Sequence, residues 1–275
     1  MPSTTPPVEP VNRTVNDQPW PEIELPPTQD ELPYDDGDKM ESPWHADNAT
    51  LIKASYIAFR GGYLTDFYVG ANMFVYFSMQ QARNQDYRGP DVFIVKNVDG
   101  KRERLSWVVW DEAGRYPDVI FELLSPSTQQ IDLEDKKQLY ATTFRTGEYF
   151  CIAPQVERLI GWRIERRTYL PIEPDTRGRL WSEELGLWLG PWRGTFMGRE
   201  DTWLRFYHSD GSLVLLPDEA ERQRAENEHQ RAVAERQRAE NEQQRADTER
   251  RRADDLAARL AEMEAELKRL RGEET

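Results

Sequence analysis

Two acidic residues and one lysine have the types and surroundings that a hydrolytic site needs. Asp91 stands at the start of a predicted strand, Val92–Val95, and Glu122 lies inside a second apolar run. A carboxylate among apolar side chains is costly to bury without a partner. A second acid, a divalent cation and a lysine would together offset that cost, and Lys136 lies on the predicted helix that follows. Mg²⁺ prefers oxygen ligands, and a nearby lysine could orient the water that attacks a phosphodiester.

A simpler interpretation of the same residues stays open. Asp91 and Asp118 both follow a proline, as acidic residues in turns often do. Glu122 could do no more than pair with Lys136. The residue types alone therefore leave a catalytic site and a set of structural contacts as alternatives.

Other catalytic chemistries have weaker signals. Ser125 and Ser127 follow a predicted strand, but no G-x-S-x-G motif surrounds them, and only His45 or His208 could serve as their base. Cys151 is the only cysteine and lies in an apolar run, which excludes an internal disulfide framework and a thiolate zinc cluster. The sequence has no G-K-[S/T] phosphate loop. Nucleophilic catalysis is therefore not expected.

The pattern of elements predicts an α/β fold with helices on a mixed sheet. A helix is expected from Trp44, with apolar residues at three- and four-residue spacing and a stop at Gly61-Gly62. Asp132–Arg145 should form a second amphipathic helix, with Gly147 as its C-terminal cap. Residues 175–217, rich in Trp and Gly, are expected to form an irregular β appendage. Runs rich in β-branched and aromatic residues predict strands at Phe67–Phe77, Asp91–Val98, Trp107–Trp110, Asp118–Leu124, Tyr149–Ala153, Arg158–Glu165 and Tyr169–Ile172.

Composition divides the chain into three regions. Residues 1–34 are acidic and rich in proline, which removes backbone donors, so a disordered arm is expected. Residues 35–217 hold most of the aromatic residues and should form the folded domain. In residues 218–275 the segment ERQRAENEHQRAVA (221–234) recurs nearly unchanged at 235–248, which predicts a long charged helix.

The heptad pattern of this helix changes along its length. A coiled-coil heptad has two core positions. In this helix the first core position holds alanine and later leucine, and the second holds glutamate and later leucine or methionine. Only residues 253–270 therefore have the apolar stripe of a coiled coil. This stretch could pair with a partner helix or with a second copy as a homodimer. The alternative is a single charged helix.

Charge and hydropathy limit the classes of partner. The net charge of −14 argues against indiscriminate nucleic-acid binding through bulk charge, although it does not exclude a local basic cleft. No apolar run approaches the ~18 residues that cross a bilayer, so no membrane association is expected. The first residues lack the basic and apolar parts of a secretory signal, so a cytoplasmic location is expected.

The candidate residues also belong to a longer pattern. The stretch PDVIFELLSPSTQQIDLEDKKQLYATTFRTGEYFCIAP (117–154) closely resembles the Uma2 family of endonucleases. The resemblance covers roughly residues 35–215 and implies a restriction-endonuclease-like fold of the PD-(D/E)xK type, which is a Mg²⁺-dependent nuclease core. The family's motifs appear in order as Pro90-Asp91, Glu122-Leu123-Leu124-Ser125-Pro126-Ser127, the series Asp132, Lys136 and Tyr140, and Glu148-Tyr149 with Ala153-Pro154.

The resemblance implies a role for each matching residue. Asp91 matches the first metal-binding acid and Glu122 the second, and Leu123 would lend its main-chain carbonyl to the metal. The lysine of the standard tripeptide would fall at position 124, where this chain has Leu124. Family members place this lysine on the following helix, which matches Lys136.

Several further residues are weaker candidates. Asp38 or Glu41 could supply an additional upstream acid, and His45 aligns with a family histidine at a helix start, although each could equally be a helix cap or a turn residue. Asp118 lies on the same predicted strand as Glu122, and the hydroxyl of Tyr140 could lie near the site. The basic residues that could contact phosphates are Lys101, Arg102 and Arg115.

Two functions from different classes follow from the sequence. In the first, the chain is an endodeoxyribonuclease that hydrolyses DNA with Mg²⁺, or with Mn²⁺ in its place. Asp91 and Glu122 would hold the metal and Lys136 would position the attacking water. In the second, the nuclease fold is a non-catalytic scaffold that binds other proteins through its C-terminal helix.

Overall fold

The computed structural model describes residues 25–34, 42–84, 89–127 and 129–271. The chain divides into two compact units. The smaller one comprises Met1–Asp38, Met73–Gly89 and Glu103–Arg115, and the larger one comprises Lys39–Asn72, Pro90–Arg102 and Tyr116–Thr275. Both candidate acids and the candidate lysine fall in the larger unit.

A six-stranded mixed sheet forms the centre of the larger unit. Its strand order is β1-β3-β5-β6-β7-β8, and only β5 and β6 run parallel. Every residue of β5 is buried, which fits a central strand of Val, Ile, Phe and Leu that a single acid, Glu122, interrupts. The strands are β1 (Phe67–Ala71), β3 (Val92–Lys96), β5 (Val119–Leu123), β6 (Glu148–Ile152), β7 (Leu159–Glu165) and β8 (Thr168–Pro171). The predicted α/β class with a mixed sheet is therefore confirmed.

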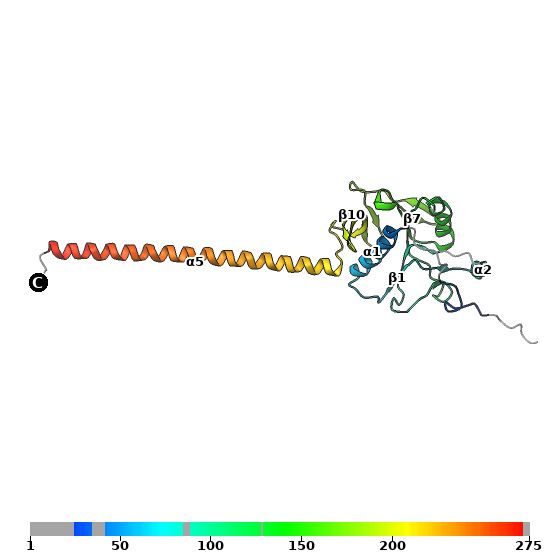
Figure 1. Ribbon diagram of the computed structural model, residues 1–275, viewed down its shortest axis with the longest axis horizontal. Helices are drawn as coiled ribbons and strands as arrows, with labels where there is room; N and C mark the ends of the chain where they lie inside the picture. The colour runs from blue at the N-terminus through cyan, green and yellow to red at the C-terminus, as the bar shows by residue number, and fades with distance from the viewer. Residues whose placement is uncertain (1–24, 35–41, 85–88, 128, 272–275) are drawn as a thin grey trace, which may run out of the picture. The chain divides into compact units, whose positions relative to one another are not determined.

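Helix α1 (Pro43–Phe59) packs against this sheet beside β1 (Figure 1). Its start is well specified, because the Ser42 side chain caps the backbone N–H of His45 and Pro43 takes the first helical position. Leu51 and Tyr56 are fully buried on its inner face. The predicted helix is confirmed, and it ends just before Gly61, which has a positive φ.

Residues 175–217 are more regular than the composition predicts. They form a three-stranded antiparallel sheet of β9 (Leu180–Ser182), β10 (Leu187–Phe196) and β11 (Arg199–Tyr207), so the expectation of an irregular appendage is wrong. The fully buried Trp203 stacks on Trp44 of α1, whose indole donates to the Thr202 carbonyl at 3.1 Å. Tryptophan here builds the core between α1 and β11.

The parallel pair β5–β6 requires a crossover, and residues 129–144 provide it as one helical run. The run passes through α3 (Gln129–Ile131), the π-helix η1 (Asp132–Lys136), α4 (Lys137–Leu139) and the π-helix η2 (Tyr140–Phe144). The predicted glycine cap is wrong: Arg145 takes the left-handed conformation, at φ 52°, and closes the run. Gly147 instead lies against the Glu184 side chain, where a Cβ atom would clash.

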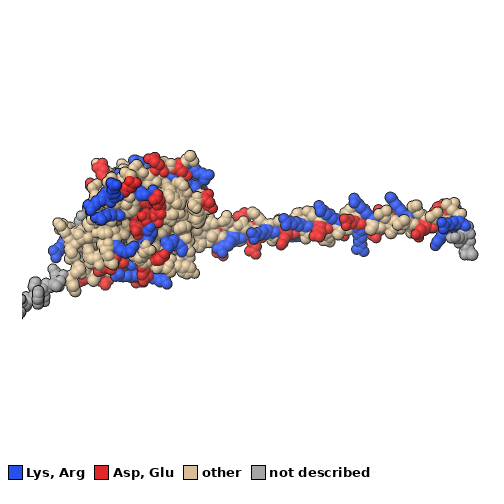
Figure 2. Space-filling model, turned by 180° about the vertical axis from the view of Figure 1, so that it is seen from behind, with Lys and Arg blue, Asp and Glu red and all other residues tan. Residues whose placement is uncertain are grey.

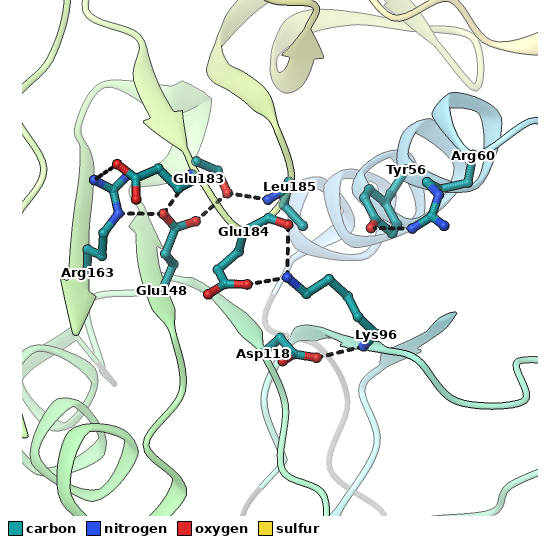
Figure 3. A network of polar contacts seen from close by, with 10 residues as sticks. Tyr56, Arg60, Lys96, Asp118, Glu148, Arg163, Glu183, Glu184 and Leu185 are labelled. Carbon is teal, nitrogen blue, oxygen red and sulfur yellow. Dashed lines mark hydrogen bonds and ion pairs between the residues drawn. The ribbon is translucent and has the colours of Figure 1, made fainter. Parts of the chain in front are cut away.

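A polar network joins the central sheet to β9 (Figure 3). Glu148 of β6 is fully buried, and its carboxylate accepts hydrogen bonds from Arg163 Nε and from the backbone N–H of Glu183, each at 2.9 Å. Its other oxygen accepts from the Ser182 hydroxyl. These partners satisfy a carboxylate that would otherwise be costly to bury. A short 3₁₀ turn, η3 (Pro154–Val156), follows β6.

The smaller unit is built around a two-stranded parallel sheet of β2 (Val75–Tyr76) and β4 (Trp107–Val108), with the short helix α2 (Met79–Arg83). The predicted strand Phe67–Phe77 is in fact two strands in different sheets, separated at Asn72, where φ is 48°.

Of the arm expected to be disordered, residues 1–24 lie outside the described residues. In residues 25–34, the Pro27 carbonyl accepts a hydrogen bond from the Trp110 indole and Leu32 is buried.

The C-terminal region is one continuous helix, α5 (Pro217–Leu270), as predicted (Figure 1). Glu219 in its first turn forms a bidentate ion pair with Arg205 of β11 and also accepts from the backbone N–H of Leu216. Beyond this turn, basic and acidic side chains alternate along the helix (Figure 2). Among the described residues, no helix combines the length and the apolar character needed to cross a membrane.

Candidate active site

Strand pairing places the two candidate acids side by side. In the antiparallel pair β3–β5, Val92 lies opposite Phe121. Asp91 precedes Val92 and Glu122 follows Phe121, so the same register brings the two carboxylates together. The Oδ2 atom of Asp91 accepts a hydrogen bond from the backbone N–H of Leu123 at 2.6 Å, which fixes its orientation.

Glu122 lies in a fully buried central strand, and its side chain is only 1% exposed. Its two oxygens have different partners. The hydroxyl of Tyr140 donates to Oε1 at 2.9 Å, and the ammonium group of Lys136 lies 3.1 Å from Oε2. Tyr140 and Lys136 both belong to the helical crossover. Packing of the crossover on the sheet therefore brings these two side chains to Glu122.

The crossover carries three of the site's side chains at intervals of four residues, namely Asp132, Lys136 and Tyr140. The two π-helical segments contain i→i+5 hydrogen bonds, so each turn holds more residues than the 3.6 of an α-helix. Residues four apart therefore stay on the side facing β5. The Tyr149 hydroxyl donates to the Asp132 carbonyl at 2.9 Å and fixes the start of this segment against β6.

Asp132 belongs to the family motif, but no role in the site was predicted for it. It is buried, and its Oδ1 lies 2.7 Å from Lys136 Nζ, so the lysine bridges Asp132 and Glu122. The spacing of four residues between an acid and a lysine on one helix was the available signal. In a polar sequence such pairs are usually exposed, and only the fold shows that this one is buried.

The site carries more negative than positive groups, and the pKa values reflect this. Burial raises the pKa of Glu122 to about 8, against the lowering effect of Lys136 and with a further rise from Asp91 and Asp132. Burial also raises the pKa of Asp91, although the Leu123 N–H, Lys136 and a hydrogen bond with Glu122 act in the opposite direction.

The pKa of Lys136 is raised above its ordinary value. Burial alone would lower it, but the carboxylates of Glu122, Asp132 and Asp91 together outweigh burial. Lys136 is therefore a cation at neutral pH. Such a group can donate hydrogen bonds and stabilise negative charge, but it cannot accept a proton from water.

The donor set suits a hard divalent cation better than a soft one. Within the residues that the structure describes, no three His, Cys, Asp or Glu side chains converge as metal ligands. A cation here would instead take oxygen atoms from Asp91, Glu122 and a main-chain carbonyl such as that of Leu123. When all three acids are ionised, three carboxylates against one ammonium leave an excess of negative charge, which a divalent cation would offset.

The other predicted candidates lie in different surroundings. Buried His45 contacts the Leu124 carbonyl at 3.3 Å and the Ser42 hydroxyl at 2.7 Å, which ties α1 to the end of β5. The Asp118 carboxylate accepts the Lys96 backbone N–H at 2.6 Å and belongs to the network of Figure 3 rather than to the site. Asp38 and Glu41 lie outside the described residues.

The basic candidates for phosphate contacts come from segments other than the strands and the crossover that carry the two acids and Lys136. Lys101 and Arg102 are exposed on the loop after β3. Arg115 belongs to the smaller unit, where its carbonyl accepts the Trp107 indole N–H at 2.8 Å. Lys137, which follows Lys136, lies over the Trp162 ring at 4.2 Å and faces away from the carboxylates.

Comparison with known families identifies the family of the chain. The model of the Uma2 family, described as "Putative restriction endonuclease", matches residues 21–193. The chain belongs to the Uma2 family. The matched range includes β3, β5 and the crossover, and therefore contains Asp91, Glu122, Asp132 and Lys136. The family supports a nuclease-like function with DNA as the substrate class. A search of curated proteins finds no significant match.

Proposed function

We propose that this Uma2 protein is a Mg²⁺-dependent endodeoxyribonuclease, with Mn²⁺ able to replace Mg²⁺. The observation that carries the proposal is the convergence of Asp91, Glu122 and Lys136 from β3, β5 and the crossover. A buried and a half-buried acid, both with raised pKa values, beside a lysine cation are an arrangement typical of functional sites.

Each residue has a distinct part in the proposed reaction. Asp91 and Glu122 would hold the cation, together with the Leu123 carbonyl. When bound, the cation would lower the pKa of a coordinated water and offset the charge that develops on the phosphate. Lys136 donates a hydrogen bond that orients the attacking water. In the hydrolysis the water oxygen bonds to phosphorus, the bond between phosphorus and the leaving sugar oxygen breaks, and that oxygen takes up a proton and leaves as a hydroxyl, so that one water is consumed.

Two further residues support the main three. Tyr140 holds one oxygen of Glu122, which limits the directions that the carboxylate can face. Asp132 holds the ammonium group of Lys136 beside Glu122 and helps to keep it protonated. A fixed arrangement of charges lowers the reorganisation needed when the phosphate becomes more negative.

The test is a metal titration of the full chain, combined with cleavage assays. Wild type, Asp91→Ala and Glu122→Ala would be titrated with Mg²⁺ and Mn²⁺ by calorimetry and incubated with plasmid and branched DNA and with RNA. Lys136→Ala and Lys137→Ala form a matched pair, because these neighbours face different surroundings.

The proposal expects metal binding and cleavage to be lost together in both acidic variants. Lys136→Ala should lose cleavage but keep metal binding, and Lys137→Ala should keep both. Wild-type protein that binds no metal and cuts no substrate would overturn the proposal and leave the scaffold function.

A further inference from the structure

The last part of α5 exposes an apolar stripe. Five large apolar side chains there are between 50% and 77% exposed, and no residue of α5 is buried. Their spacing alternates between four and three residues, so they follow one face of the helix in a heptad pattern. They are Leu256, Leu260, Met263, Leu267 and Leu270.

The charges that flank the stripe are complementary to a second copy of the same segment. Leu260 and Leu267 take heptad position a, and Leu256, Met263 and Leu270 take position d. The flanking g positions are then Arg259 and Glu266, and the e positions are Glu264 and Arg271. In two parallel helices in register, Arg259 of one copy faces Glu264 of the other, and Glu266 faces Arg271. Every such pair joins opposite charges, which favours this pairing.

The upstream part of α5 lacks this complementarity. Its two core positions hold alanine and glutamate, as at Ala239 and Glu242. In the same register, Arg231 would face Arg236 and Arg245 would face Arg250, so like charges would meet. Pairing is therefore limited to the end of the helix, where the apolar stripe and the opposite charges coincide.

We propose that residues 253–271 of α5 form a docking surface for the same segment of a second copy, in a parallel two-stranded coiled coil. Burial of the stripe supplies the driving force, and the flanking charges select the copy and its orientation. This inference concerns assembly and does not rest on the proposed nuclease activity.

The first test measures the mass of the full chain by sedimentation over a range of concentrations. Wild type should change from the 32.2 kDa monomer to a dimer as concentration rises. The double variant Leu260→Glu/Leu267→Glu should remain a monomer. The matched control Ala232→Glu/Ala239→Glu introduces two glutamates at the same heptad position upstream and should still dimerise.

Folding is checked in each variant by tryptophan fluorescence, which reports on the domain rather than on α5, since α5 contains no tryptophan. A wild-type chain that stays monomeric at all concentrations would overturn the inference. Equal dimerisation of the leucine double variant would overturn it as well, because the stripe would then have no part in assembly.

A charge exchange tests the orientation. Arg259→Glu/Glu266→Arg would place like charges opposite each other in a parallel pair and should weaken the dimer. Adding Glu264→Arg/Arg271→Glu should restore it. In an antiparallel pair Arg259 would face Glu266 instead, and exchanging these two would leave the attraction in place. Undiminished dimerisation of the first variant would therefore contradict the parallel arrangement.

Discussion

The ammonium group of Lys136 lies 2.7 Å from the carboxylate of Asp132, four residues earlier on the same helical run. Lys136 therefore has an acidic partner on its own element as well as Glu122 on the sheet. A long, flexible side chain is held in one place when it has two such partners. This makes Asp132 a positioning residue for the lysine rather than a group that touches the substrate.

Asp132→Asn should lower the cleavage rate about 10- to 100-fold, because asparagine lacks the negative charge that holds the Lys136 ammonium group, and a tenfold change in rate corresponds to about 1.4 kcal/mol. It should also lower the pKa of Lys136, which Asp132 helps to raise. The pH–rate profile of the variant would show both effects. Asp135→Asn, an exposed neighbour on the same run, should match wild type in rate and profile.

The stability of the metal-free protein should fall as pH rises from about 4.5 to about 8. The pKa of Glu122 is higher in the folded protein than its ordinary value, so the folded state binds more protons in this window. Asp91 acts in the same direction. Urea unfolding at several pH values measures the slope.

Glu122→Gln should make this pH dependence shallower, and so should Mg²⁺, since a cation favours the ionised carboxylates. Glu134→Gln, at an exposed position, should leave it unchanged. A wild-type stability that rises through this window would contradict the burial of these acids.

Tyr140→Phe should remove the hydrogen bond to Glu122 while keeping the ring contacts with Phe144 and Tyr149. We expect the free energy of unfolding to fall by about 1–3 kcal/mol. Without this donor, the pKa of Glu122 should rise further. Denaturant titrations and the pH dependence of stability measure the two effects.

Tyr169→Phe is the matched control for Tyr140→Phe. Its buried hydroxyl donates to the Thr146 carbonyl instead of to a carboxylate of the site. This variant should also lose stability, but the pH dependence and the cleavage rate should stay as in wild type. Identical effects of both variants on cleavage would argue against a role for Tyr140 in holding Glu122.

Glu148→Gln should destabilise the fold without altering the site. The amide nitrogen of glutamine cannot accept the hydrogen bonds that the Glu148 carboxylate accepts from Arg163, Ser182 and Glu183. We expect a loss of about 1–3 kcal/mol, measured by urea unfolding. Glu183→Gln changes an exposed partner of the same arginine and should cost less than about 0.5 kcal/mol.

The sequence predicted the elements that local pattern specifies. Asp91 and Glu122 stand out because charged residues interrupt apolar strands, and Lys136 stands out because the family motif places it on the next helix. The heptad pattern predicted α5. These signals come from the local pattern and from the family motif, and the structure has strands β3 and β5, the helical crossover and α5 where they predict them.

Features that depend on distant residues could not be predicted in the same way. The strand Phe67–Phe77 divides because Asn72 takes a left-handed conformation and the two halves pair with different partners. Residues 180–207 become a regular sheet because β11 packs on α1, more than 140 positions earlier. Asp132 joins the site because Tyr149 and the π-helical turns orient the crossover, and neither is visible in the local pattern.

Cys151 gives the protein a built-in reporter of how often its site opens. It is the only cysteine of the chain, it is buried, and it lies directly opposite Glu122 in the parallel pair β5–β6. A thiol reagent can reach it only when these strands separate, so the labelling rate of the folded protein measures local opening at the strand that carries Glu122. A ligand that binds both Asp91 and Glu122 should slow this labelling, because it would hold the strand that carries Glu122 in place. Occupancy of the site can thus be followed in the wild-type chain, with no substrate turnover and no engineered cysteine.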